Sequence, residues 1–216
     1  MISKEKDNLS IRAYESIKKM ILNGELKPGQ AISINAMAET LQISRTPVTN
    51  ACQRLEYEKL LTVIPKQGAI INTISIESAC GIYELRAAIE SYNAKRVMDI
   101  FTDKDIEILK ESIKKQQQIA KNEDAKAFME EDIFFHRYIL DKNINYELSS
   151  ITNQLYDRAF MVGIKNIMSS RLSESINEHL YILEKLEQQD RQGFADAIEE
   201  NILNGLRSLT SNFLSK

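Results

Sequence analysis

Residues 33–56 read SINAMAETLQISRTPVTNACQRLE and contain two helical patterns separated by a tight turn. Ser33 and Ser44 stand directly before the two patterns, where a serine side chain can cap the first turn of a helix. Gln42-Ile43 is the expected turn, and the second helix is expected over residues 45–58. The apolar positions of the first pattern recur at helical spacing and predict an inner face of Ile34, Met37, Ala38 and Leu41.

The segments on either side complete a recognisable order of elements. A helix is predicted upstream, over about residues 10–23, and it ends at Asn23-Gly24. Downstream, two β-rich runs at 60–64 and 69–73 flank a turn at 65–68, which predicts a hairpin. Helix, short helix, turn, helix and hairpin is the order of a winged helix-turn-helix, so residues 1–74 are predicted to form a DNA-binding domain.

The outer face of the third helix carries polar side chains without carboxylates, as a surface that enters the major groove should. Val48, Cys52 and Leu55 form the opposite, inner stripe. The hairpin would bring its tip to the sugar-phosphate backbone or the minor groove. A merely solvated face is the alternative for this helix. The candidate DNA contacts are Arg45, Thr46, Thr49, Asn50, Gln53, Lys66, Gln67 and Gly68.

Composition fits a globular, cytoplasmic protein. The 216 residues are 43% hydrophobic and 27% charged, and no apolar run approaches the length of a transmembrane helix. Residues 1–74 carry 10 basic against 7 acidic side chains, whereas residues 75–216 carry 18 against 24. A basic N-terminal part on an acidic remainder is compatible with nucleic-acid binding by the N-terminal part alone.

The remainder of the chain, residues 75–216, is predicted to be all-helical. It contains no proline, and apolar residues recur at helical spacing throughout. About six amphipathic helices joined by short turns are expected, the last three near 144–169, 171–189 and 191–214. The fold class is therefore mainly α: a winged helix-turn-helix with a small β-hairpin, followed by an antiparallel helical bundle.

Both histidines of the chain lie in this bundle. Asp132 and His136 are four residues apart and share one helix face. His179 and Asn201 would face each other if their helices form a hairpin that turns near residues 190–193. These four nitrogen and oxygen donors predict a divalent metal site inside the bundle. A structural helix-face pair is the alternative for Asp132 and His136.

The N-terminal part resembles the GntR family of bacterial repressors. The resemblance rests on ILNGELKPGQ at 21–30, AETLQISRTPV at 38–48 and RLE at 54–56, within about 65 residues. It implies DNA contacts from Arg45, Thr46 and the Gln67-Gly68 wing tip. Thr49 and Asn50 replace the family's usual Arg-Glu, which implies a different operator or weaker binding. Gln42 and Lys59 replace the family's usual glycines, so two turns must form without the residue that adopts positive φ at the lowest energy.

The bundle resembles the FCD effector domain of the FadR branch of GntR regulators. YELRAAIE at 83–90, Asp132-x-x-x-His136 and EHxxIL at 178–183 carry the resemblance. It implies a divalent metal such as Zn, Ni or Mn, with Asn201 in place of the usual third histidine and therefore weaker binding. Arg86 matches the family's carboxylate-binding arginine; an ion pair with Glu90 is its structural alternative. Further candidates for the effector cavity are Tyr83, Arg137, Asn153 and Arg158.

Together these features predict a homodimeric transcriptional repressor that is no enzyme. Residues 75–216 would bind a small organic acid and dimerise, and the two N-terminal domains would bind a pseudo-palindromic double-stranded operator. A metal-dependent enzyme is a weaker reading, because no general base or nucleophile accompanies the candidate ligands. A ligand-independent architectural protein is the third reading, and no membrane partner is expected.

Overall fold

The computed structural model describes residues 2–143, 145–166 and 169–214. The chain forms two compact units, Met1–Thr73 and Ile74–Lys216. Each unit has its own hydrophobic core.

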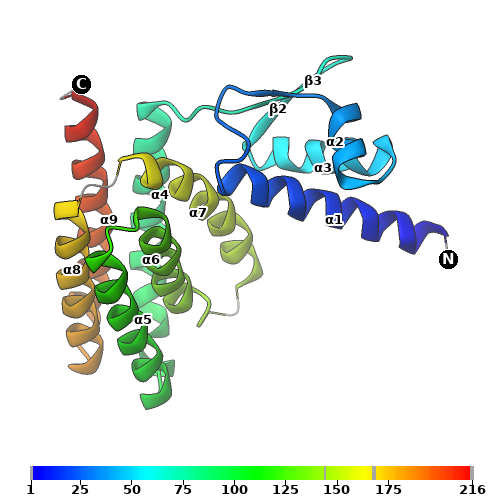
Figure 1. Ribbon diagram of the computed structural model, residues 1–216. Coiled ribbons are helices and arrows are strands. Elements are labelled where there is room, and N and C mark those ends of the chain that lie inside the picture. The colour runs from blue at the N-terminus through cyan, green and yellow to red at the C-terminus, as the bar shows by residue number, and fades with distance from the viewer. Residues whose placement is uncertain (1, 144, 167–168, 215–216) are drawn as a thin grey trace. The chain divides into compact units, whose positions relative to one another are not determined.

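The first unit is a winged helix-turn-helix, as predicted (Figure 1). Its sheet is antiparallel with strand order β1-β3-β2. The two-residue strand β1 was not predicted, because two residues cannot display an alternating pattern. The elements are α1 (Ile2–Leu22), β1 (Ala31–Ile32), α2 (Ile34–Leu41), α3 (Arg45–Tyr57), β2 (Leu61–Ile64) and β3 (Gly68–Ile71).

Burial of the predicted stripe on α3 holds this unit together. Val48, Cys52 and Leu55 are fully buried and pack in a core that also contains Ile17 of α1. Ser33 caps α2 by accepting a hydrogen bond from the Ala36 N–H group at 3.4 Å. Ser44 occupies the N-cap position of α3, but its side chain makes no capping hydrogen bond there.

Two turns of this unit adopt the left-handed backbone that the sequence predicted. Gln42 ends α2 with φ 55° and Lys59 follows α3 with φ 60°. Glycine would adopt this conformation without a Cβ clash, so both turns are strained by their side chains.

The second unit is the predicted helical bundle. α4 packs along α9, and α8 packs against both α5 and α9, so the last two helices form an antiparallel hairpin (Figure 1). None of the described helices is long and apolar enough to cross a membrane. The elements are α4 (Ile76–Val97), the 3-10 turn η1 (Met98–Ile100), α5 (Asp103–Lys121), α6 (Ala125–Leu140), α7 (Tyr146–Asn166), α8 (Ser169–Glu187) and α9 (Arg191–Leu214).

The bundle core surrounds a small polar interior. Phe128 and Phe135 of α6 and Phe194 of α9 are completely buried, and Phe135 stacks on the imidazole of His179 at 4.3 Å between ring centroids. These large side chains fix α4, α6, α8 and α9 around the buried polar groups of the interior.

Candidate functional sites

Three predicted metal ligands converge inside the bundle. Asp132 and His136 extend from one face of α6, and His179 comes from α8. One potential ligand atom from each lies within 4.8 Å of the other two. Both imidazoles are buried, and Asp132 Oδ1 lies 3.5 Å from His179 Nε2. Within the described part of the chain His179 Nε2 has no hydrogen-bond partner, as expected of an atom reserved for a metal.

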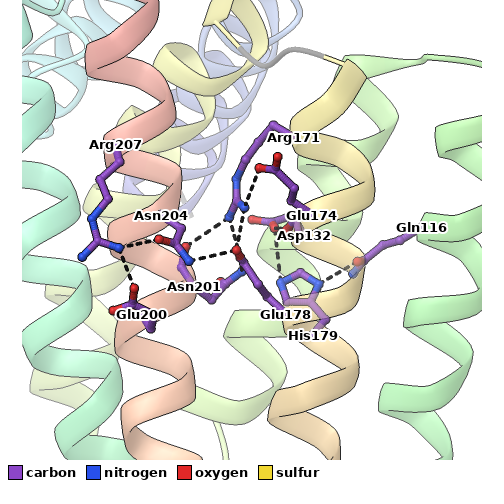
Figure 2. A network of polar contacts seen from close by, with 11 residues as sticks. Gln116, Asp132, Arg171, Glu174, Glu178, His179, Glu200, Asn201, Asn204 and Arg207 are labelled. Atoms are coloured by element: carbon purple, nitrogen blue, oxygen red, sulfur yellow. Dashed lines mark hydrogen bonds and ion pairs between the residues drawn. The ribbon is translucent and has the colours of Figure 1, made fainter.

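The other nitrogen of each imidazole lies close to a buried polar side chain. Gln116 of α5 places its Oε1 2.7 Å from His179 Nδ1 (Figure 2). Glu90 of α4 places its Oε2 2.8 Å from His136 Nδ1. Burial lowers the pKa of His179 to about 3, so this ring is neutral near pH 7. Two imidazoles and a carboxylate fit a divalent transition metal, and the neutral ring is the form that ligates.

Asn201, the predicted fourth ligand, is tied to α8 by a carboxylate. Its Nδ2 donates to Glu178 Oε2 at 2.7 Å, and Asn204 donates to the other oxygen at 2.9 Å (Figure 2). Arg171 donates to the same carboxylate through both terminal nitrogens, at 2.8 and 2.6 Å. Since the nitrogen of the Asn201 amide faces Glu178, its oxygen is the atom left to act as a ligand.

A cavity of about 50 Å³ adjoins these groups. Arg86 and Tyr83 of α4 line it together with Asp132, His136 and Asn201. The cavity therefore brings together three of the four metal candidates, without His179, and two of the predicted effector contacts. Its wall also includes Arg171 and Ser175 of α8, which the sequence did not predict.

Arg86 combines both of the roles that the sequence left open. Its Nε donates to Glu90 Oε1 at 2.9 Å, so the pair with Glu90 exists. Its Nη2 is buried and has no hydrogen-bond partner among the described residues. Burial favours the neutral form, but Glu90 raises the pKa of Arg86 above its ordinary value, so the guanidinium stays charged. A buried, charged and unpartnered N–H group suits a carboxylate oxygen.

The structure does not bring the remaining effector candidates to the cavity. Arg137 is exposed on the outer surface of α6, because it follows the inward-facing His136 and points about 100° away around the helix. Asn153 is half-buried on α7 and does not line the cavity. Arg158 donates to Ser78 Oγ at 2.7 Å instead. The expected inward placement of Arg137 is wrong, and Asn153 lies outside the lining of this cavity.

Two contacts of the site were missed, because a helix pattern does not reveal partners on other helices: that of Gln116 with His179 and that of Glu90 with His136. Gln116 is fully buried on α5 and Glu90 is 3% exposed on α4. Gln116 continues the buried stripe of Leu109 and Ile113. A polar side chain at such an inward position was the signal from which a buried polar role could have been predicted.

Most candidate DNA contacts are exposed on the first unit. Arg45, Thr46, Asn50 and Gln53 are exposed along α3, Thr49 is half-buried, and Lys66 and Gln67 are exposed at the hairpin tip. Asn50 Nδ2 donates to Ser10 Oγ of α1 at 3.4 Å, so this amide is already engaged.

Gly68 is not part of the exposed wing tip. It is buried, and a Cβ atom there would lie 2.1 Å from the carbonyl oxygen of Ile32. The expected DNA contact by Gly68 is therefore wrong, because β1 covers this position. Its absent side chain serves the close approach of β1 and β3 instead.

A winged helix-turn-helix joined to a helical bundle with a polar cavity defines a class of bacterial transcriptional regulators. The model of the gntR family of bacterial regulatory proteins matches residues 9–71, and the FCD domain model matches residues 81–204. The chain belongs to the GntR family and carries an FCD effector-binding domain. This is a family of transcriptional regulators rather than enzymes.

Individual relatives and structures agree with this family. The chain is 25% identical over 185 residues to the HTH-type transcriptional regulator YdhC of Bacillus subtilis, which covers 84% of this chain and 82% of YdhC. It is 25% identical over 150 residues to the gluconate operon transcriptional repressor of Bacillus subtilis, covering 69% and 61%.

Solved structures share the fold. Escherichia coli McbR/YncC matches with a TM-score of 0.83 and 23% identity, covering 95% of this chain and 98% of that one. A metal-free FCD domain, of TM0439, matches with a TM-score of 0.58 and 18% identity, covering 67% and 100%. FCD domains can bind a metal, and this chain has a corresponding group of one aspartate and two histidines.

Proposed function

We propose that this regulator is a homodimeric, cytoplasmic repressor whose affinity for its operator is controlled by a small carboxylate bound in residues 75–216. The observation that carries this proposal is the buried Nη2 of Arg86, which has no hydrogen-bond partner among the described residues and belongs to a side chain on the wall of the 50 Å³ cavity. A charged guanidinium without a full set of acceptors is costly unless an anion completes it. The similarity to the gluconate operon repressor supports the assignment to repression.

A divalent metal would assist the carboxylate. Asp132, His136 and His179 would supply three ligands, and the Asn201 amide oxygen is the candidate for the fourth. When bound, the metal would contribute positive charge toward an anionic effector. Compared with a site of one aspartate and three histidines, a site with an amide oxygen in place of one imidazole has a weaker preference for zinc. It favours a harder ion such as manganese.

The N-terminal unit, residues 1–74, would bind the operator. Arg45, Thr46, Thr49 and Gln53 would face the major groove from α3, and Lys66 and Gln67 would reach the backbone or minor groove. None of these residues carries a carboxylate, and all of them except the half-buried Thr49 are exposed, which supports this arrangement. A two-fold dimer would present two such surfaces to two half-sites.

Electrophoretic mobility shifts of full-length protein on DNA upstream of its own gene test the operator part. Binding at low salt is expected, and Arg45→Ala should weaken it, whereas Lys104→Ala, an equal loss of charge on exposed α5, should not. Absence of any shift at low salt would count against DNA control.

Thermal unfolding with a panel of small carboxylates tests the effector part. A carboxylate that binds the folded state should raise the Tm, and Arg86→Met should abolish the increase. If neither carboxylates nor divalent metals shift the Tm of the wild type, the protein is better described as a ligand-independent architectural regulator.

A further inference from the structure

The side chain of Glu90 lies against both Arg86 and His136, a histidine of the metal-ligand group. Its Oε1 accepts from Arg86 Nε at 2.9 Å, and its Oε2 lies 2.8 Å from His136 Nδ1. All three side chains are at most 4% exposed, so water does not compete for these contacts. One carboxylate thus connects the proposed anion site with the proposed metal site.

Toward His136, Glu90 determines which ring nitrogen carries the proton. An ionised carboxylate only accepts hydrogen bonds. The Arg86 guanidinium, whose Nε lies 2.9 Å from Glu90 Oε1, favours the ionised carboxylate. An Nδ1–H group is the form of His136 from which this carboxylate, 2.8 Å away, can accept, and that form leaves the lone pair on Nε2. Gln116 Oε1 holds His179 Nδ1 in the same way, so both rings offer Nε2 as ligand.

Toward Arg86, Glu90 determines which N–H groups remain for an anion. It engages Nε, and the terminal Nη2 is left buried without a partner in the described chain. Arg86 lines the cavity together with Asp132 and His136. The orientation of one carboxylate therefore fixes both the imidazole and the guanidinium.

We propose that Glu90 is a positioning residue that couples metal binding at His136 to anion binding at Arg86. The inference rests on the proposed function, since it assumes that both ligands enter the cavity. A metal on His136 Nε2 makes Nδ1–H a stronger donor and holds the Glu90 carboxylate in place. An anion on Arg86 requires that same carboxylate position, so each ligand favours the other, and the enhancement is reciprocal.

Nitrogen NMR of the imidazoles tests the positioning without any ligand. The chain has two histidines, so untagged, metal-free protein gives a fully interpretable ¹⁵N spectrum. Both rings are expected in the Nδ1–H form, which is the less common tautomer of free histidine. Gln116→Leu should release His179 alone. An Nε2–H tautomer of His136 in the wild type would overturn the assignment of Glu90.

Titration calorimetry with Ni²⁺ and acetate tests the coupling. In the wild type, saturating acetate should tighten Ni²⁺ binding by at least about 5-fold, and Ni²⁺ should tighten acetate binding equally. Glu90→Gln leaves one acceptor oxygen for two donors, Arg86 Nε and His136 Nδ1. The variant should therefore bind Ni²⁺ about 10- to 100-fold more weakly, and the mutual enhancement should disappear.

Gln116→Leu is the matched control, because it disturbs a histidine without touching Arg86. It should lose Ni²⁺ affinity to a similar degree but keep the enhancement and the metal-free affinity for acetate. Should Glu90→Gln fail to fold, Arg86→Met/Glu90→Leu removes both buried charges and leaves His136 Nδ1 without its acceptor, so His136 should lose its fixed tautomer.

The outcomes separate the two proposals. Enhancement that survives in Glu90→Gln would show that metal and anion interact directly and would overturn the role of Glu90. Binding of both ligands without enhancement in the wild type would overturn the coupling alone. Binding of neither would overturn the effector function and the coupling together.

Discussion

Two glycines with positive φ should respond differently to substitution, because one is packed against backbone and the other is not. Gly68 has φ 124° and lies against the Ile32 carbonyl, whereas Gly24 has φ 76° and a Cβ atom added there would meet nothing within 4 Å. Gly68→Ala should therefore lower the free energy of unfolding by about 3 kcal/mol, through strain and a backbone clash. Urea unfolding measures it, with Gly24→Ala as the control, expected near 1 kcal/mol. Equal losses would contradict the packing role of Gly68.

Gln42 and Lys59 present the converse case, since both are non-glycine residues in the left-handed region. Glycine removes a Cβ penalty of about 1–2 kcal/mol per site but makes the unfolded chain more flexible by about 0.5–1 kcal/mol. The double variant Gln42→Gly/Lys59→Gly should therefore raise the free energy of unfolding by about 1 kcal/mol. Chemical denaturation at two protein concentrations would measure it, and a decrease would show that these side chains make stabilising contacts.

At the scale of elements, α8 and α9 are joined by the carboxylate of Glu178. It accepts two bonds from buried Arg171, and one each from Asn201 and Asn204 (Figure 2). Glu178→Ala leaves the Arg171 charge without its main partner. Since Glu178 is 23% exposed, the loss should be about 2 kcal/mol, below that of a fully buried pair.

Glu174→Ala is the matched control for this element contact. Glu174 also approaches Arg171, at 3.7 Å, but it is 64% exposed and should contribute almost nothing. Thermal unfolding of both variants in parallel compares them. A similar fall in Tm for the two would mean that Glu178 does not hold the hairpin.

The elements themselves were largely predictable, whereas the contacts between them were not. Helical spacing and the absence of proline after Pro65 predict the bundle. The positions of serine and proline predict where α2 begins and where the hairpin turns. The group of Asp132, His136 and His179 was predictable from spacing and resemblance. The contacts of Glu90 with His136 and of Gln116 with His179 were not, because each depends on a side chain from another helix. Periodicity on one helix contains no such information.

At the scale of the whole molecule, the uneven charge of the chain bears on how it would bind DNA. Residues 1–74 carry a small basic excess and residues 75–216 a larger acidic one. The acidic part repels DNA, so binding should depend on a few basic side chains of the first unit and be sensitive to salt. The observed association constant should fall steeply between about 50 and 200 mM salt.

The contribution of the wing to this salt dependence can be measured directly. Lys66 is exposed at the hairpin tip, and loss of one phosphate contact reduces the slope of log K against log salt by about 1. A dimer with two wings should therefore lose about 2 in slope on Lys66→Ala, measured by fluorescence anisotropy with an operator fragment. Lys104→Ala, in the acidic unit, should leave the slope unchanged. An unchanged slope in Lys66→Ala would mean that the wing does not contact the phosphate backbone, and recognition would rest on α3 alone.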